Sequence, residues 1–146
     1  MAETRKKILC IEDDPEVAAL IAEDLVDRGF EVSIAHNGQE GLTAIVRTSP
    51  DIVLCDINMP IMSGFEMAER LAAIAPKLGN IAFVFMTAMS NDDSEIKAQR
   101  FGAYVRKPID FDRLGSIIDA RLVRLAPDQA DPKPVSPNDD KLQTLT

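Results

Sequence analysis

Acidic side chains stand directly after two apolar segments of this chain. Glu12 and Asp13 follow the first of these segments, and Asp56 follows another, with Asn58 two residues further on. Carboxylates that crowd together repel one another, and a hard divalent cation with oxygen ligands is the ordinary means of keeping them ionised. Mg²⁺ suits an open site better than Ca²⁺, because it keeps several waters and needs only one or two carboxylates. The acidic residues therefore predict a site for Mg²⁺, in which Mn²⁺ could substitute.

A hydroxyl and an ammonium group follow two further apolar segments, as Thr87 and Lys107. A lysine can neutralise the charge of a phosphoryl group, and a threonine hydroxyl can donate a hydrogen bond to one of its oxygens. If these two residues meet the acidic residues in one place, the combination indicates a site that handles a phosphoryl group.

Each of these residues also has a simpler interpretation when it is taken alone. Carboxylates favour the N-terminus of a helix, and Asp14 before Pro15 is itself expected to be an N-cap. Thr87 alone would be a capping residue, and Lys107 alone would be a solvated charge. Only their joint placement favours the phosphoryl site.

The elements that would position these residues alternate between short β-branched segments and segments with helical periodicity. This alternation is typical of an α/β fold with a mainly parallel sheet. The predicted strands are 7–12, 30–35, 51–55, 81–86 and 103–106, and the predicted helices are 15–29, 39–48, 65–75, 92–101 and 111–125. Strand 81–86 is the most apolar, so we expect it to be central and buried on both faces. Because the carboxyl ends of parallel strands share one edge, the four polar groups should face one cleft.

Length and composition indicate one folded domain followed by a tail. A chain of 146 residues with 46% hydrophobic content suffices for one domain with a real core. We expect this domain to span 1–126. The segment 127–146 is rich in proline and acidic or polar residues, and it has too few aliphatic side chains to offset the entropy of ordering, so we expect it to be flexible.

Charge and cysteine content narrow the class of protein further. The net charge of −8 repels phosphate backbones, so we expect no direct binding to nucleic acid. No apolar segment approaches the ~20 residues of a membrane span, so we expect a cytoplasmic protein without a membrane partner. Cys10 and Cys55 both lie in predicted buried strands, where we expect no disulfide. A redox pair would need an exposed, electropositive setting instead.

Four segments of the chain together resemble the response-regulator receiver family. They are Ile8–Pro15 (ILCIEDDP), Asp51–Gly64 (DIVLCDINMPIMSG), Phe85–Ala88 (FMTA) and Tyr104–Pro108 (YVRKP), each at a predicted strand end and in the family's order. The resemblance covers roughly residues 6–125. It implies a flavodoxin-like, CheY-like fold: a doubly wound sheet of five parallel strands in the order 2-1-3-4-5 with five helices.

The resemblance implies a specific role for each acidic residue of the cleft. Asp56 would be the phosphoacceptor and also a metal ligand. Asp13 would bind the metal directly, while Glu12 would support it through water. Asn58 would offer the metal its backbone carbonyl.

The remaining implied roles concern the phosphoryl oxygens and the output. Thr87 would bond a phosphoryl oxygen, and Lys107 would pair first with Asp56 and then with the phosphoryl group. The bond between Lys107 and Pro108 would be cis, which is allowed before proline at modest cost. Thr87 and Tyr104 would form the switch, with Tyr104 moving into space that Thr87 leaves. A half-buried packing role for Tyr104 is the open alternative.

As a family member, the chain would be a stand-alone response regulator and not a classical enzyme. It would take a phosphoryl group from a histidine kinase or a histidine phosphotransfer protein, as part of a two-component system or phosphorelay, and signal by contact with a downstream protein. It would act as a monomer or as a phosphorylation-dependent dimer.

Two rival classes remain open on the residues alone. A haloacid-dehalogenase-like phosphatase also uses an aspartyl nucleophile, but it would want a second aspartate where this chain has Asn58. A flavodoxin-like cofactor binder would want a Ser/Thr/Gly loop after the first strand, where this chain has carboxylates.

Overall fold

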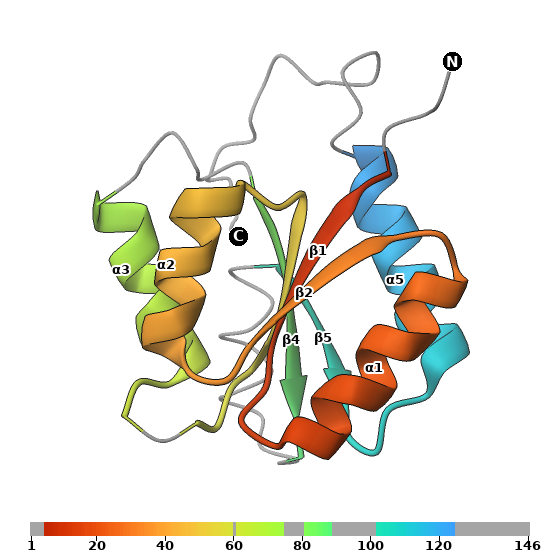
Figure 1. The fold of residues 1–146 in the computed structure, drawn as a ribbon, viewed down its shortest axis with the longest axis horizontal. Helices are drawn as coiled ribbons and strands as arrows, with labels where there is room; N and C mark the ends of the chain where they lie inside the picture. Colours follow the sequence, from red (N-terminus) through yellow and green to blue (C-terminus); the bar gives the residue numbers. More distant parts are fainter. Residues whose placement is uncertain (1–4, 60, 75–80, 89–101, 125–146) are drawn as a thin grey trace, which may run out of the picture.

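The fold is a five-stranded parallel sheet covered by helices on both faces (Figure 1). The computed structural model describes residues 5–59, 61–74, 81–88 and 102–124. The strands are β1 (Lys7–Ile11), β2 (Glu31–Ala35), β3 (Ile52–Asp56), β4 (Ala82–Thr87) and β5 (Gly102–Arg106). The helices are α1 (Pro15–Asp27), α2 (Gly38–Thr48), α3 (Gly64–Ile74) and α5 (Phe111–Arg124). The strand order β2-β1-β3-β4-β5 confirms the predicted topology.

Two predicted features lie outside the described residues. These are the helix expected at 92–101 and the tail expected at 127–146. The other predicted strands and helices are all present, with ends that differ from the predicted ones by one or two residues.

Helices α2 and α3 lie on one face of the sheet, and α1 and α5 lie on the other (Figure 1). Successive strand residues point to opposite faces, so each strand contributes to both apolar clusters. Leu9, Val53 and Phe85 pack toward α2 and α3, whereas Ile8 and Leu54 pack toward α1 and α5. All six residues of β4 are buried, which confirms that this strand is covered on both faces.

The helices begin where the sequence provides a capping side chain. Asp14 is the N-cap of α1, as predicted, because its carboxylate accepts hydrogen bonds from the backbone N–H groups of Glu16 and Val17. Asn37 caps α2 by accepting a hydrogen bond from the N–H of Glu40. These caps fix the direction in which the chain leaves the carboxyl ends of β1 and β2.

The second half of the chain differs from the prediction at two element ends. Asp56 was expected to begin a loop, but it is the last residue of β3 and pairs with Met86 of β4. Gly102 was expected to end a helix, but it is the first residue of β5, where it pairs with Phe83. Asp56 is therefore held by the sheet itself.

Both cysteines are free and buried, as predicted. Burial raises the pKa of Cys10 to about 12 and raises the pKa of Cys55 well above its ordinary value. Neutral, buried thiols of this kind behave as small apolar side chains, which does not fit a redox pair. Within the described residues, no helix has both the length and the apolar character needed to cross a bilayer.

Candidate functional site

Parallel pairing brings the ends of four strands to one edge of the sheet. Glu12 directly follows β1, Asp56 ends β3, Thr87 ends β4 and Lys107 directly follows β5. The register places Asp56 beside Met86, one residue before Thr87. The structure therefore brings together side chains that are far apart in the sequence, as expected for the carboxyl edge of such a sheet.

Three carboxylates form the acidic part of the site. Glu12, Asp13 and Asp56 each offer one oxygen, and these oxygens all lie within 4.8 Å of one another. Glu12 is 1% exposed and Asp56 is 5% exposed, whereas Asp13 is exposed to solvent. Hard oxygen donors at this spacing, two of them buried and one open to water, fit a Mg²⁺ ion that keeps part of its hydration shell.

Lys107 bridges the two buried carboxylates. Its Nζ lies 2.7 Å from Glu12 Oε1 and 3.2 Å from Asp56 Oδ2. The sequence led us to expect a pair with Asp56, whereas the structure adds a shorter contact to Glu12. The N–H of Lys107 also donates to the carbonyl of Thr87 at 2.8 Å, and the peptide bond between Lys107 and Pro108 is cis, as predicted.

Burial and pairing act against each other on the ionisation of this pair. Burial raises the pKa of Glu12, and the charge of Asp56 adds to the rise, while hydrogen bonds from Lys107 and from the N–H of Asp14 oppose it. Burial by itself lowers the pKa of Lys107, but the contacts with Glu12 and Asp56 outweigh it and raise that pKa. Lys107 is therefore held as a cation between two carboxylates.

Asp56 has a different hydrogen-bond donor on each of its carboxylate oxygens. Oδ1 accepts the backbone N–H of Asn58 at 3.1 Å, and Oδ2 accepts from Lys107. The backbone of Asn58 thus lies against the acidic cluster, although its carbonyl as a metal ligand stays a prediction. A carboxylate held from both oxygens has a fixed orientation.

Thr87 and Tyr104 lie near each other in the sheet but in different environments. Thr87 is buried at the end of β4, and Arg106 is its partner residue in β5. Tyr104 is half-buried, pairs with Phe85 and packs against the apolar cluster on the α2 and α3 face. Tyr104 thus has the packing role that the sequence left open, and its part in a switch stays a prediction.

Two contacts of the Asp56 backbone were not predicted from the sequence. An added Cβ at Gly64 would lie 2.7 Å from the backbone carbonyl oxygen of Asp56, so only glycine allows α3 to start this close to β3. The Cys55 thiol donates to the same carbonyl oxygen at 3.3 Å. The only signal in the sequence was the short distance from Asp56 to Gly64 along a polar loop.

Comparison with known proteins bears on the same residues. The sequence model of the family described as "Response regulator receiver domain" matches residues 8–119, which include every residue of the site. "Probable transcriptional regulator ycf29" of Porphyra purpurea is 35% identical over 119 residues, which are 80% of this chain and 56% of that protein. The chain thus spans about half the length of this relative.

Two further relatives are matched along most of their length. An "Uncharacterized 14.6 kDa protein in sodA1 3'region" of Leptolyngbya boryana is 31% identical over 123 residues, 83% of this chain and 93% of that protein. The crystal structure of a CheY-like response regulator receiver domain protein from Methanospirillum hungatei is 27% identical, with a TM-score of 0.75. That alignment covers 84% of this chain and 97% of the other.

Proposed function

Because this chain belongs to the response regulator receiver domain family, we propose that it is a phosphorylation-dependent switch in which Asp56 accepts the phosphoryl group. As a receiver domain of a two-component response regulator it is a signalling protein and not a classical enzyme. Membership of this family argues against the two rival interpretations, the haloacid-dehalogenase-like phosphatase and the flavodoxin-like cofactor binder. The observation that carries the proposal is the buried contact of Lys107 with both Asp56 and Glu12 beside Asp13.

The proposed reaction is a displacement at phosphorus. A carboxylate oxygen of Asp56 forms the new O–P bond while the P–N bond of a donor phosphohistidine breaks, and the imidazole leaves with the bonding electrons. Asp56 needs no general base, because its carboxylate is already a nucleophile. The N–H of Asn58 and the ammonium of Lys107 fix the orientation of that carboxylate before the reaction.

Lys107 would then neutralise charge on the transferred group, because its Nζ already lies between the two buried carboxylates. The Thr87 hydroxyl would donate to another phosphoryl oxygen. Receiver domains bind Mg²⁺ at an acidic site, and here Asp13, Asp56, Glu12 through water, and the Asn58 carbonyl would hold the ion. The ion would supply positive charge to the phosphoryl oxygens.

The proposed output is a shift between two conformations of the surface near Thr87 and Tyr104. A receiver domain implies a histidine kinase as partner. We further propose that a histidine phosphotransfer protein can serve as donor, and that the chain acts in the cytoplasm, as a monomer or as a phosphorylation-dependent dimer. Its net charge of −8 favours a protein as the downstream target over nucleic acid.

The test is the intact mass after incubation with acetyl phosphate and Mg²⁺. The wild type should gain one phosphoryl group, and Asp56→Asn should gain none. Asp14→Asn is the matched control, because it also removes one carboxylate beside the site, but asparagine still caps α1. A phosphoryl group on Asp56→Asn, or none on the wild type, would overturn the proposal.

A further inference from the structure

His36 connects the turn after β2 to the acidic residues that follow β1. Its ring nitrogen Nδ1 lies 3.3 Å from the backbone carbonyl oxygen of Glu12. A carbonyl oxygen can only accept a hydrogen bond, so this contact assigns a proton to Nδ1. The N–H of Glu12 donates to the carbonyl of Ala35 at 3.0 Å. Both polar groups of the Glu12 main chain are therefore bonded to Ala35 and His36.

The carbonyl of Glu12 belongs to the peptide unit that leads into Asp13. A peptide unit is planar, so a contact that fixes the Glu12 carbonyl oxygen also fixes the direction in which the Asp13 backbone starts. The Glu12 side chain is held separately, by Lys107 and by the N–H of Asp14. Asp13 is the exposed carboxylate of the acidic cluster, so the orientation of its backbone has a large part in deciding where that carboxylate lies.

The turn that carries His36 is anchored on two sides. The N–H of His36 donates to the Glu40 carboxylate at 2.9 Å, and the N–H of Glu40 donates to Asn37 Oδ1 at 2.8 Å. The first turn of α2 thus holds the backbone of the turn. On the other side, an added Cβ at Gly38 would lie 3.0 Å from the side chain of Met62, which is buried in the loop between β3 and α3. The backbone at His36 therefore has little freedom to shift.

We propose that His36 is a positioning residue for the metal site, and that it raises the affinity for Mg²⁺ by fixing the peptide unit between Glu12 and Asp13. The inference rests on the proposed function, because it takes the acidic cluster as the Mg²⁺ site. His36 does not belong to the three residues whose ligand atoms lie within 4.8 Å of one another, so it acts through Asp13 and not on the ion.

The size of the effect follows from the geometry that Mg²⁺ demands. The ion requires nearly ideal octahedral coordination, so a displaced carboxylate costs affinity. Groups that orient metal ligands commonly contribute about 10- to 100-fold to metal affinity. Because His36 is exposed and its contact of 3.3 Å is long for a hydrogen bond, we expect a smaller effect here, of about three- to tenfold.

Two amide variants separate this role from a purely structural one. Asparagine carries an N–H group at about the position of the histidine Nδ1, whereas glutamine carries the same amide one carbon further from the backbone. A histidine that only stabilised the turn would affect unfolding and leave the Mg²⁺ affinity of the folded chain unchanged. A positioning residue should be replaceable by asparagine but not by glutamine.

The test is the dissociation constant of Mg²⁺ for the full chain, measured by isothermal titration calorimetry without a phosphodonor. We expect His36→Ala and His36→Gln to weaken Mg²⁺ binding about three- to tenfold, and His36→Asn to stay within about twofold of the wild type. The Tm of each variant in EDTA checks that it is folded before Mg²⁺ is added.

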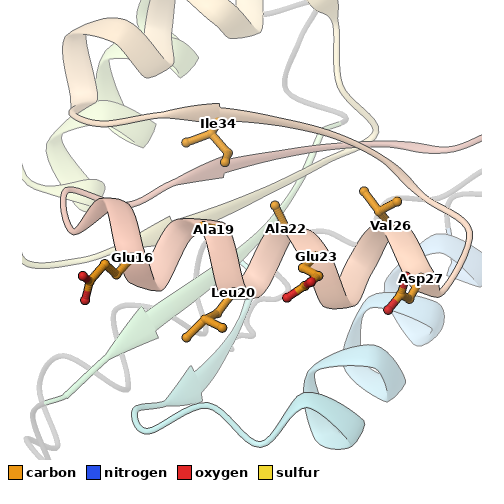
Figure 2. A pocket seen from close by; sticks show the side chains of 8 residues that line it. All are labelled: Glu16, Ala19, Leu20, Ala22, Glu23, Val26, Asp27 and Ile34. Atoms are coloured by element: carbon orange, nitrogen blue, oxygen red, sulfur yellow. The ribbon is translucent and has the colours of Figure 1, made fainter.

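Ile34 provides a control on the same strand. Figure 2 shows its side chain at an open groove along α1, and no residue of the acidic cluster lines this groove. Ile34 is 40% exposed, so Ile34→Thr changes an exposed side chain two residues before His36. This variant should keep the Mg²⁺ affinity of the wild type.

Three results would overturn the proposal. They are a Mg²⁺ affinity in His36→Ala equal to or higher than that of the wild type, equal losses in His36→Asn and His36→Gln, and equal losses in Ile34→Thr and His36→Ala. A wild type that does not bind Mg²⁺ would remove the metal site and this role of His36 together. Failure of the proposed function would look different, because the wild type would bind Mg²⁺ in the titration but gain no phosphoryl group from acetyl phosphate.

Discussion

Lys107 is the residue on which the electrostatics of the cleft depend. Its Nζ contacts Glu12 and Asp56, whose carboxylates are almost fully buried. Buried charges are tolerated when they are paired and are costly when a partner is removed. Lys107 therefore offsets the repulsion between two like charges before any phosphoryl group is present, and its position also suits it to contact that group afterwards.

We expect Lys107→Met to slow phosphorylation of Asp56 by acetyl phosphate about 10- to 100-fold, because one cation that neutralises the transferring group is lost. The same change should lower the free energy of unfolding by about 1–3 kcal/mol, since two buried carboxylates lose their partner. A time course of intact mass gives the rate, and urea unfolding gives the stability. Lys6→Met, which changes an exposed lysine just before β1, is the control. A rate equal to that of the wild type would remove Lys107 from the reaction.

Ile61 carries backbone strain in the loop between β3 and α3. It is a β-branched residue with a φ of 75°, in the left-handed region that favours glycine, and its side chain is 86% exposed. Ile61→Gly should therefore raise the free energy of unfolding by about 0.5–1 kcal/mol, because relief of strain exceeds the entropy that glycine adds to the unfolded chain. Urea unfolding measures the difference.

The matched control for Ile61 is Val46, an exposed β-branched residue in the helical backbone of α2. Val46→Gly should lower the free energy of unfolding by about 0.5–1 kcal/mol. If both glycine variants were destabilised alike, backbone strain at Ile61 would be the wrong explanation.

At the scale of elements, the close approach of α3 to β3 depends on one glycine. Gly64→Ala should lower the free energy of unfolding by about 1–3 kcal/mol, because its Cβ would meet the backbone of Asp56 and Ile57, which cannot move away cheaply. The same change should slow phosphorylation, since it displaces the end of β3 that carries Asp56. Thermal unfolding and the mass time course measure the two effects.

Gly115 of α5 provides the matched control for this substitution. The three atoms nearest to an added Cβ there all belong to the side chain of Arg28, whose exposed guanidinium end can shift. Gly115→Ala should leave phosphorylation unchanged and keep or raise stability by up to about 1 kcal/mol, because alanine favours a helix over glycine. Equal destabilisation of both variants would show that the contact with the Asp56 backbone is unimportant.

The elements and the meeting point of the site could be predicted from the sequence, because both follow from local patterns. Alternating apolar segments specify parallel strands, and parallel strands bring their carboxyl ends to one edge, so Glu12, Asp56 and Lys107 had to lie near each other. The shorter contact of Lys107 to Glu12 could not be predicted, since it depends on side-chain packing between residues far apart in the chain.

At the scale of the whole molecule, the sheet acts as a platform with a packed apolar layer on each face. Alternate residues of the same strands form both layers, so a shift of β3 would alter the packing of the helices on both faces. The acidic cluster is concentrated at one edge of this platform in a chain that already carries a net charge of −8. Repulsion among these acids opposes folding, and a cation that binds only the folded chain would relieve it.

Mg²⁺ should therefore stabilise the folded protein without any phosphodonor. At a Mg²⁺ concentration about 100 times its dissociation constant, the gain is about 2.7 kcal/mol, which should raise the Tm by about 5 °C or more relative to NaCl of equal ionic strength. Asp13→Asn should abolish most of this rise, because Asp13 is the exposed member of the acidic cluster. Asp14→Asn removes the same charge one residue away, keeps the cap of α1 and should retain the rise. A Tm that responds equally in both variants would mean that Mg²⁺ acts by general screening, and the three carboxylates would then not form a metal site.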